Sequence, residues 1–417
     1  MKKLVALLLC LMMVVPATLA SAETAEGKVL NIWCWNDEFQ SRFNAYYPEV
    51  KEIAEDKSTT TLNDGTIVKW TINPNEGNNY QNKLDEALRA QESAAADDKI
   101  DIFLIEADYA LKYVDSPYTL DVKADIGLTD EDLGGQYKYT QEIATSADGK
   151  LKAVTWQATP GLFAYRRSIA KDVLGTDDPD AVQEALADWD KFNAVAEQAA
   201  AKGYYMLSGY DDAYRTFSNN VSAPWVADDG ETVVVDANLM KWVDQTKLYT
   251  DKGYNHKSSL WDATWAADQG PTGKVFGFFY STYWGGTWIC AAAGTDNVAT
   301  IKDVMQKLTC DAAIAKKITE DTQDYTNNVA AMNELAQNYS SAFLGGQNHI
   351  ALFAEAAPKI DMSNISAYDQ GLNESFQGAF KNYFDGNATI DEAKAQFESI
   401  ISEKYPELVN FQWPDAK

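Results

Sequence analysis

Histidine and the sequence motifs of common enzymes are scarce in this chain. Only two histidines occur among its 417 residues. Neither His256 nor His349 lies in a nucleophile elbow such as GxSxG, so a Ser-His-Asp or Cys-His mechanism has no evident base. HExxH, GxGxxG and P-loop patterns are absent, which removes the usual sequence support for a metalloprotease, a dinucleotide enzyme or a P-loop NTPase. We therefore predict a protein that is not an enzyme and has no metal or cofactor.

Basic side chains are also few. Lysine and arginine number 35 against 62 aspartates and glutamates, which gives a net charge of −27. Loss of Lys2 and Lys3 with the signal peptide described below changes the charge to −29 (−27 minus 2). A chain this acidic, without a compensating basic patch, does not follow a phosphate backbone. We therefore expect no nucleic-acid partner.

Cysteine is rare as well, with four in the whole chain. Those after residue 22 are Cys34, Cys290 and Cys310, and no CxxC or Cys/His spacing suggests a zinc site. Three cysteines in an exported protein allow one disulfide at most. Cys290–Cys310 is the candidate pair.

Long hydrophobic runs are missing after the first residues. Lys2 and Lys3 precede an apolar run over residues 4–15, and Ala20-Ser21-Ala22 has the small residues of a cleavage site. We interpret residues 1–22 as a signal peptide cleaved after Ala22. No later segment reaches the ~18 uninterrupted apolar residues that a membrane span needs. The mature chain is expected in the periplasm or at the outer face of the cell membrane.

The remaining chain predicts an α/β protein with two domains. About 395 residues remain (417 minus 22), which is the length of roughly two domains. Strands are expected at 29–33, 67–72 and 102–105, with helices at 38–47 and 80–95 between them. Such alternation predicts a parallel or mixed sheet covered by helices. Trp33 alternates with Cys34 along the first strand, and we expect Trp33 in the core.

A second α/β unit is expected after about residue 155. Helices are predicted at 178–187, 188–202, 239–252 and 389–402, the last opened by a capping box of Thr389 and Glu392. Residues 153–165 and 278–290 are apolar and aromatic where a linker should be polar. We interpret these two stretches as strand-like connections that form a hinge between two lobes, where ligands are commonly bound.

Aromatic rings and carboxylates recur together at the predicted strand ends and turns. A pyranose ring has an apolar face that stacks on an aromatic ring and a rim of hydroxyls that suits carboxylates and amides. The sequence therefore indicates a sugar site. The groups are Trp35 with Asn36 and Asp37, Glu106 and Asp108 before Tyr109, Trp156 beside Gln157, Asp211 and Asp212 before Tyr214, and Tyr368 before Asp369 and Gln370.

Five stretches, in order along the chain, resemble extracellular solute-binding proteins of carbohydrate ABC transporters, the broad family that includes maltose-binding protein. They are "KVLNIWCWNDEF", "DIFLIEADYALKYVD", "TWQATPGLFAYRRSI", "YWGGTWICAAAGTDN" and "AFLGGQNHIALFAEAAPKIDMSNISAYDQGLNESFQ". The resemblance implies two lobes, each a mostly parallel sheet flanked by helices, joined by a strand hinge. The N-terminal lobe would be 23–155 plus 284–345, and the C-terminal lobe 156–283 plus 346–417.

The resemblance also implies the function: a monomeric receptor that binds a mono- or oligosaccharide between its lobes and delivers it to ABC permease subunits. Tyr280 or Phe279 stands where relatives have a stacking tryptophan, and Trp284 and Trp288 flank Gly285-Gly286. The substrate-binding residues implied are Trp35, Asn36, Asp37, Glu106, Asp108, Trp156, Gln157, Asp211, Asp212, Tyr214, Tyr280, Trp284, Trp288, Tyr368, Asp369 and Gln370.

Two other functions stay open from the sequence. One is a secreted carbohydrate-active hydrolase that uses a pair of carboxylates in an aromatic cleft. The other keeps the receptor fold but binds another small polar solute, because carboxylates at the same positions can pair with a cationic ligand.

Overall fold

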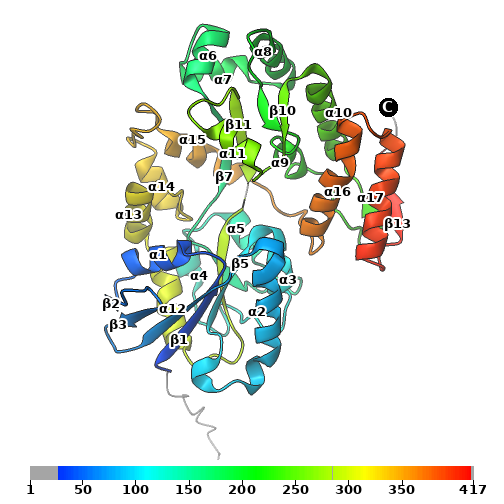
Figure 1. Cartoon of the computed structure of the whole chain (residues 1–417). Helices are drawn as coiled ribbons and strands as arrows, with labels where there is room; N and C mark the ends of the chain where they lie inside the picture. Colours follow the sequence, from blue (N-terminus) through cyan, green and yellow to red (C-terminus); the bar gives the residue numbers. More distant parts are fainter. Residues whose placement is uncertain (1–26, 284, 415–417) are drawn as a thin grey trace, which may run out of the picture.

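The computed structural model describes residues 27–283 and 285–414, which form two lobes with separate hydrophobic cores (Figure 1). The first core is built from residues 30–158 and 283–357, and the second from residues 169–276 and 372–408. The predicted α/β fold with two lobes is therefore confirmed. The first core includes Trp156, Ile350 and Ala357, which lie beyond the lobe boundaries predicted at residues 155 and 345.

The first lobe is built on one seven-stranded sheet with the strand order β2-β3-β4-β1-β5-β12-β6. β1 runs parallel to both β4 and β5, whereas β2, β3, β12 and β6 are added in antiparallel pairs. The strands are β1 (Val29–Cys34), β2 (Val50–Ile53), β3 (Thr59–Leu62), β4 (Ile67–Ile72), β5 (Ile102–Glu106), β6 (Ala153–Val154) and β12 (Thr287–Ala291).

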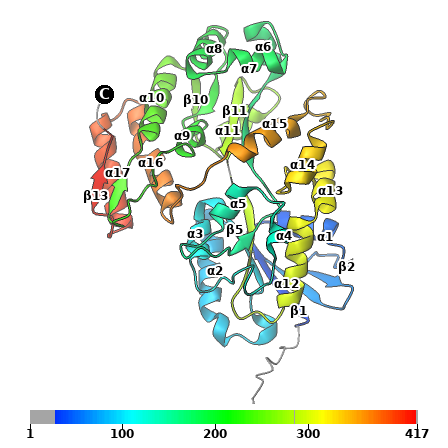
Figure 2. The same cartoon turned by 180° about the vertical axis from the view of Figure 1, so that it is seen from behind.

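Helices cover both faces of this sheet. The chain moves from β1 through α1 to β4 and then returns through α2 to β5, so right-handed connections place α1 and α2 on opposite faces, as Figures 1 and 2 show. The helices of this lobe are α1 (Glu38–Tyr46), α2 (Asn79–Ala90), α3 (Ala110–Val114), α4 (Asp130–Leu133), α5 (Lys138–Ile143), α12 (Val298–Met305), α13 (Ala312–Thr322), α14 (Val329–Leu335) and α15 (His349–Ala356).

The second lobe is mostly helical around short strand pairs. β8 (Leu207–Gly209) pairs in parallel with β10 (Asn255–Ser258), and β9 (Thr232–Val234) pairs in parallel with β13 (Asn410–Gln412). The helices are α6 (Arg167–Leu174), α7 (Pro179–Ala185), α8 (Trp189–Ala201), α9 (Tyr214–Ser218), α10 (Ala237–Lys252), α11 (Ala263–Gln269), α16 (Asp369–Phe384) and α17 (Ile390–Lys404). The expectation of a mostly parallel sheet in each lobe is corrected: the first sheet is mixed, and the second lobe has only two-stranded sheets among its described residues.

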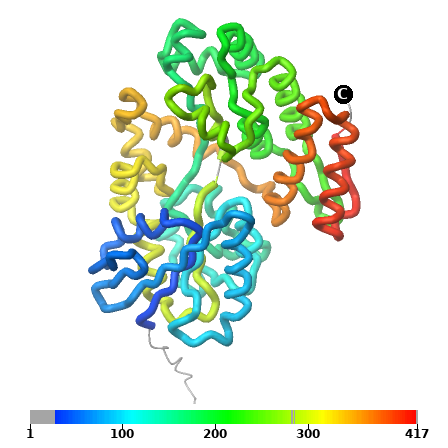
Figure 3. The backbone as a smooth tube through the Cα atoms, viewed as in Figure 1, coloured from blue at the N-terminus to red at the C-terminus, as the bar shows by residue number. Residues whose placement is uncertain are grey.

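The chain passes between the lobes three times (Figure 3). Two passages are the antiparallel strands β7 (Pro160–Tyr165) and β11 (Gly277–Tyr283), in which Phe163 pairs with Phe279. β7 falls within the aromatic stretch predicted at 153–165, and β11 begins one residue before the stretch predicted at 278–290. The third passage lies between Ile365, which packs on the first core, and Tyr368, which packs on the second.

Three narrower expectations differ from the structure or lie outside it. Cys34 is fully buried and Trp33 only half-buried, so the assignment of Trp33 rather than its neighbour to the core is wrong. Cys290 and Cys310 are both free, which excludes the proposed disulfide. The predicted signal peptide lies outside the described residues. Within residues 27–283 and 285–414, no helix has the length and apolar character needed to cross a membrane.

Candidate functional site

A cavity of about 820 Å³ lies between the two lobes, and we call it the cleft. Its first wall belongs to the N-terminal lobe and its second wall to the C-terminal lobe. The first wall comprises Trp35, Asn75, Glu76, Glu106, Asp108, Tyr109 and Gly285, and the second Asp211, Tyr214, Arg215, Leu260, Trp261, Gln370, Glu374 and Gln377.

The first wall is formed where two parallel strands end. Trp35 follows β1, and Glu106 is the last residue of β5, which lies next to β1 in the sheet. The carboxyl ends of parallel strands meet at one edge of a sheet, so these side chains are brought together. Glu106 also caps the short 3-10 helix η4 (Ala107–Tyr109), since its Oε2 accepts a hydrogen bond from the Asp108 backbone N–H at 2.8 Å.

The second wall is formed by two helices and a loop. Asp211 lies just before α9, and Tyr214 and Arg215 form its first turn. Gln370, Glu374 and Gln377 are spaced four and then three residues apart on α16, which places them on one helical face. α16 contacts η4 of the first lobe, so the two walls meet at this end of the cleft.

Each wall carries a tryptophan. The ring of Trp35 is partly buried and packs edge-on against Tyr80 and Tyr109, at centroid distances of 5.5 and 6.3 Å. Trp261, in the loop after β10, is 69% exposed, and its ring packs against that of Trp265 at a centroid distance of 4.9 Å. Its backbone φ of +69° is unusual for a bulky residue. The cleft thus has an indole on each side, one held by packing and the other presented to solvent.

An ion pair crosses the cleft between the lobes. Arg215 Nη2 lies 2.6 Å from Asp108 Oδ2, and both side chains are largely buried. Burial opposes the charge on the guanidinium, but the neighbouring Asp108 carboxylate more than compensates and raises the pKa of Arg215. The only arginine that lines the described cleft is therefore already paired within the protein.

The other inner carboxyls hold their protons more tightly than free carboxyls do. Burial, together with the nearby charge of Asp108, raises the pKa of Glu106. Burial likewise raises the pKa of Asp211, although that side chain accepts a hydrogen bond from the Leu260 N–H at 3.3 Å. Both groups consequently lie in surroundings that disfavour a bare negative charge.

A smaller hollow of about 60 Å³ lies behind the ion pair and shares Asp108, Tyr109 and Arg215 with the cleft. Tyr109, Tyr283 and Ser218 line it, and their hydroxyls have no hydrogen-bond partner among the described residues. Asp369 also lines this hollow, and burial is the main cause that raises its pKa to about 7. The hollow is large enough for one or two water molecules bound by these hydroxyls.

The structure brings six of the sixteen predicted site residues to the cleft. Asp369 lines only the hollow behind it. The six are Trp35, Glu106, Asp108, Asp211, Tyr214 and Gln370. Among them Tyr214 is 1% exposed and uses its hydroxyl to bond Asn373 Oδ1 at 2.5 Å, so it supports the wall more than it offers a surface.

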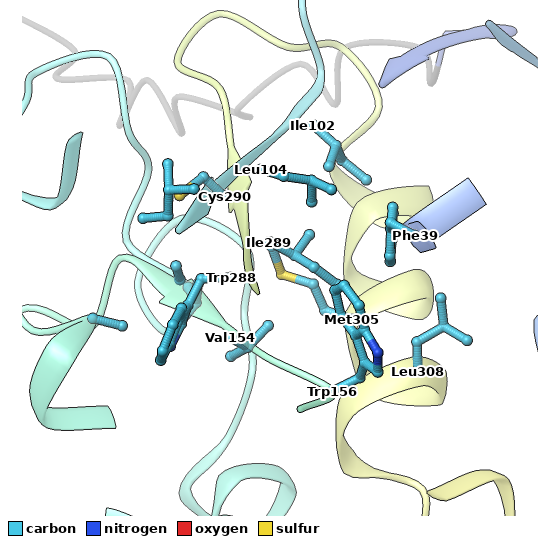
Figure 4. Packing of buried hydrophobic residues seen from close by; sticks show 14 of the residues in the cluster. Phe39, Ile102, Leu104, Val154, Trp156, Trp288, Ile289, Cys290, Met305 and Leu308 are labelled. Atoms are coloured by element: carbon cyan, nitrogen blue, oxygen red, sulfur yellow. The ribbon is translucent and has the colours of Figure 1, made fainter. Parts of the chain in front are cut away.

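Trp156 and Trp288 are placed elsewhere, and the prediction that they contact a ligand is wrong for this structure. They are 2% and 1% exposed in the core of the first lobe (Figure 4). Trp156 packs on Phe39 at a centroid distance of 5.2 Å, and Trp288 Nε1 donates to the Thr140 carbonyl at 2.9 Å. A ring buried on both faces cannot stack on a sugar.

The remaining predicted residues also lie away from the lining of the cleft. Asp212 Oδ2 accepts backbone hydrogen bonds from Ser208 and Gly209, which is a structural role. The others make local contacts, are exposed outside the cleft lining or fall outside the described residues. Gln157 bonds Glu38 and the Thr287 N–H, Tyr280 bonds Gln269, Tyr368 bonds Glu407, Asn36 and Asp37 are exposed, and Trp284 lies outside the described residues.

Several cleft residues were missed by sequence reasoning. Tyr109 was named with its neighbours Glu106 and Asp108, and Arg215 directly follows Tyr214, but neither was included among the predicted substrate-binding residues. Trp261 lies in a polar loop with no strand before it in the prediction, and only its pairing with Trp265 one helical turn later marks it. The other missed residues are Asn75, Glu76, Leu260, Gly285, Glu374 and Gln377.

No protein-family model and no curated protein sequence matches this chain. Several solved structures, in contrast, are similar to this chain. One, described as an extracellular solute-binding protein of family 1, is 16% identical with a TM-score of 0.69, covering 90% of this chain and 99% of that one. The ABC transporter associated binding protein from B. animalis subsp. lactis Bl-04, in complex with beta-1,6-galactobiose, is 15% identical with a TM-score of 0.65, covering 92% of this chain and 100% of that one.

A further similar structure is the GacH receptor of Streptomyces glaucescens GLA.O, solved unliganded and with acarbose. It is 13% identical with a TM-score of 0.64, covering 91% of this chain and 99% of that one. Coverage of nearly both full lengths means that the two lobes and their connections correspond. The chain therefore has the two-lobed fold of extracellular solute-binding proteins, with the cleft between its lobes.

Proposed function

We propose that this protein is an exported receptor that binds a mono- or oligosaccharide in the cleft and delivers it to the permease subunits of an ABC transporter. One observation carries the proposal: Trp35 and Trp261 lie on opposite walls of a cavity of about 820 Å³ that is otherwise lined by carboxylates and amides. This volume is within the range of about 300–1,000 Å³ typical of small-molecule sites.

The chemistry of the lining suits a saccharide. Each indole offers a face for the apolar side of a sugar ring, and Asp211, Gln370 and Gln377 offer acceptors and donors for hydroxyls. A stacking contact and a few hydrogen bonds, each contributing about 1 kcal/mol, reach micromolar affinity when a preformed cleft reduces the cost of association.

The connections between the lobes supply the means of response. Three passages of chain join the lobes, and β7 and β11 run side by side between them. A ligand that contacts both walls favours the closed arrangement and acts by population shift rather than by chemistry. The lobe boundaries in this proposal are those predicted near residues 155, 283 and 345, moved so that each lobe contains the residues of its own core. We further propose that the receptor is a monomer and that residues 1–22 are its signal peptide.

The test is isothermal titration of the mature protein against a saccharide panel that includes maltose, beta-1,6-galactobiose and acarbose. We expect micromolar binding of at least one saccharide and a loss of about tenfold or more in Trp261→Ala. Phe343→Ala is the matched control, because Phe343 is 88% exposed and lies outside the cleft lining. Silence across the panel with a response to amino acids would contradict the saccharide assignment, and recovery of a cleaved sugar would favour the hydrolase.

A further inference from the structure

Carboxylates dominate the charged residues of the cleft. Five carboxylates and one guanidinium line it, and Arg215 is committed to Asp108 at 2.6 Å. Lys381 lies close enough to influence Asp211, but its Nζ donates to Ser259 Oγ at 3.2 Å and it does not line the cleft. The carboxylates are Glu76, Glu106, Asp108, Asp211 and Glu374.

These carboxylates are distributed along the cleft rather than gathered at one point. Glu106 and Asp211 lie on opposite walls, whereas Glu76 and Glu374 are exposed at its rim. Among the described residues, no three acidic, histidine or cysteine side chains converge as a metal ion requires. The arrangement therefore suits positive charge spread over an organic molecule, not a single metal ion.

The cleft is also lined by neutral groups that can bind a ligand, namely a hydroxyl without a hydrogen-bond partner in the described part of the chain and two indole rings. Tyr109 is 5% exposed, lines the cleft, and its hydroxyl has no partner among the described residues. The faces of Trp35 and Trp261 attract a cation placed over them as well as stacking on a ring. Ring faces, an unpartnered hydroxyl and carboxylates together form a site for a molecule that has both ring surface and ammonium groups.

We infer that the ligand is cationic, namely a saccharide that carries one or more amino groups in place of hydroxyls. This inference deepens the proposed function and rests on it. An ammonium group between Glu106 and Asp211 compensates both carboxylates when closure of the lobes removes water from them. A neutral sugar gives no such compensation, so deprotonating either carboxyl in the drier site costs free energy.

The pKa shifts of the two inner carboxyls agree with a cationic ligand. Burial and the adjacent Asp108 raise the pKa of Glu106, and burial raises the pKa of Asp211. Arg215 acts against this rise at Glu106, and Lys381 acts against it at Asp211, but burial outweighs both, so a further cation would stabilise the charged forms. A bound ammonium supplies that cation and releases a proton from any carboxyl that was protonated.

The experiment is titration of the full mature chain with matched probes: a disaccharide of two glucosamine units, its N-acetylated neutral counterpart, and spermidine. The amines are kept protonated, and low and high salt are compared. We expect the charged disaccharide to bind at least about tenfold more tightly than the acetylated one, which is about 1.4 kcal/mol. High salt should reduce this preference, because the attraction is between charges.

Variants assign the preference to the cleft. Glu106→Gln with Asp211→Asn should abolish the preference for the charged disaccharide, and the exposed rim variant Glu374→Gln, whose folding is not at risk, should reduce it. Glu86→Gln, an exposed carboxylate of α2 outside the cleft lining, is the matched control and should change nothing.

The outcomes separate this inference from the proposed function. Equal or tighter binding of the acetylated disaccharide overturns the cationic ligand and leaves a saccharide receptor. Binding of spermidine without either disaccharide overturns both the amino saccharide and the saccharide receptor, and indicates a receptor for a cationic solute without a sugar ring. Absence of binding by both charged probes at millimolar concentration overturns the inference.

Discussion

Arg215 and Asp108 join the two walls of the cleft, with Nη2 of the guanidinium 2.6 Å from Oδ2 of the carboxylate. Asp108 belongs to η4 of the first lobe and Arg215 to α9 of the second. The pair is therefore a direct contact between the lobes, and wider opening of the cleft has to break it.

Replacing Arg215 by Met should shift the unliganded protein toward more open arrangements. The charge of Asp108 is left without its partner, and the lobes lose an attractive contact. We expect a larger radius of gyration by small-angle X-ray scattering and a loss of about 1–2 kcal/mol in unfolding free energy, since the pair is partly shielded from water. Lys112→Met is the control, because Lys112 pairs with Asp85 within the first lobe. An unchanged radius in Arg215→Met would contradict the role of the pair.

Trp288→Phe should lower stability without weakening ligand binding. The smaller ring leaves space in the first core and leaves the Thr140 carbonyl without its indole donor. We expect a loss of about 1–3 kcal/mol in unfolding free energy, measured by chemical denaturation. Trp261→Ala should show the reverse pattern, because that ring is 69% exposed in the cleft. Weaker saccharide binding by a folded Trp288→Phe variant would contradict this prediction and indicate that Trp288 contributes to the binding site.

Asp369 should make the protein less stable as the pH rises. Burial is the main cause that raises its pKa to about 7, whereas an unfolded aspartate titrates near about 4. Between these values the folded state binds more protons, so the unfolding free energy falls as the pH rises through this window, by up to about 4 kcal/mol.

Asp369→Asn tests that pH dependence, because Asn Oδ1 can keep the hydrogen bonds from Ser366 N–H and Oγ. Denaturation at a series of pH values should show a flatter profile and a more stable protein at neutral pH in this variant. The exposed Asp391 of α17 provides the control Asp391→Asn. Parallel profiles of Asp369→Asn and the wild type would refute the assignment.

Gly286→Ala should destabilise the first lobe. Gly286 has a φ of +107°, and a Cβ there would lie 3.1 Å from the Trp288 ring. Strained backbone and crowding against a buried ring together predict a loss of about 2 kcal/mol or more in unfolding free energy. Gly378→Ala is the control, since Gly378 lies within α16 with open space around it and alanine favours a helix. Thermal unfolding of the two variants should therefore move in opposite directions.

Periodicity and local signals were enough to predict most elements. The strand at 67–72 was predicted with the bounds that β4 has, and the capping box of Thr389 and Glu392 begins α17 as expected. Helices closed by turn residues were predicted to within a few residues, because caps and apolar spacing are properties of neighbouring residues. The direction of a strand depends instead on partners far away in the sequence. β12 joins the first sheet antiparallel to β5 after the chain has passed through the second lobe, and no local pattern predicts this.

The site was less predictable, because the sequence does not tell which way a ring points. Trp35, Trp156 and Trp288 all adjoin predicted strands, yet only Trp35 reaches the cleft. For Trp156 and Trp288 the direction is set by the pairing of β6, β12 and β5, which involves partners far away in the chain. Trp261 faces the cleft because a loop of the second lobe carries it there, and the prediction had assigned that loop no role.

The pairing of Glu106 with Thr287 has a consequence for how the molecule can be divided. The sheet of the first lobe takes β12 from a part of the chain that is synthesised only after most of the second lobe. No continuous fragment that ends before residue 287 contains all seven strands, so a truncated first lobe would expose the unpaired edge of β5. Assembly of that lobe must wait for the distant strand, which favours slow folding.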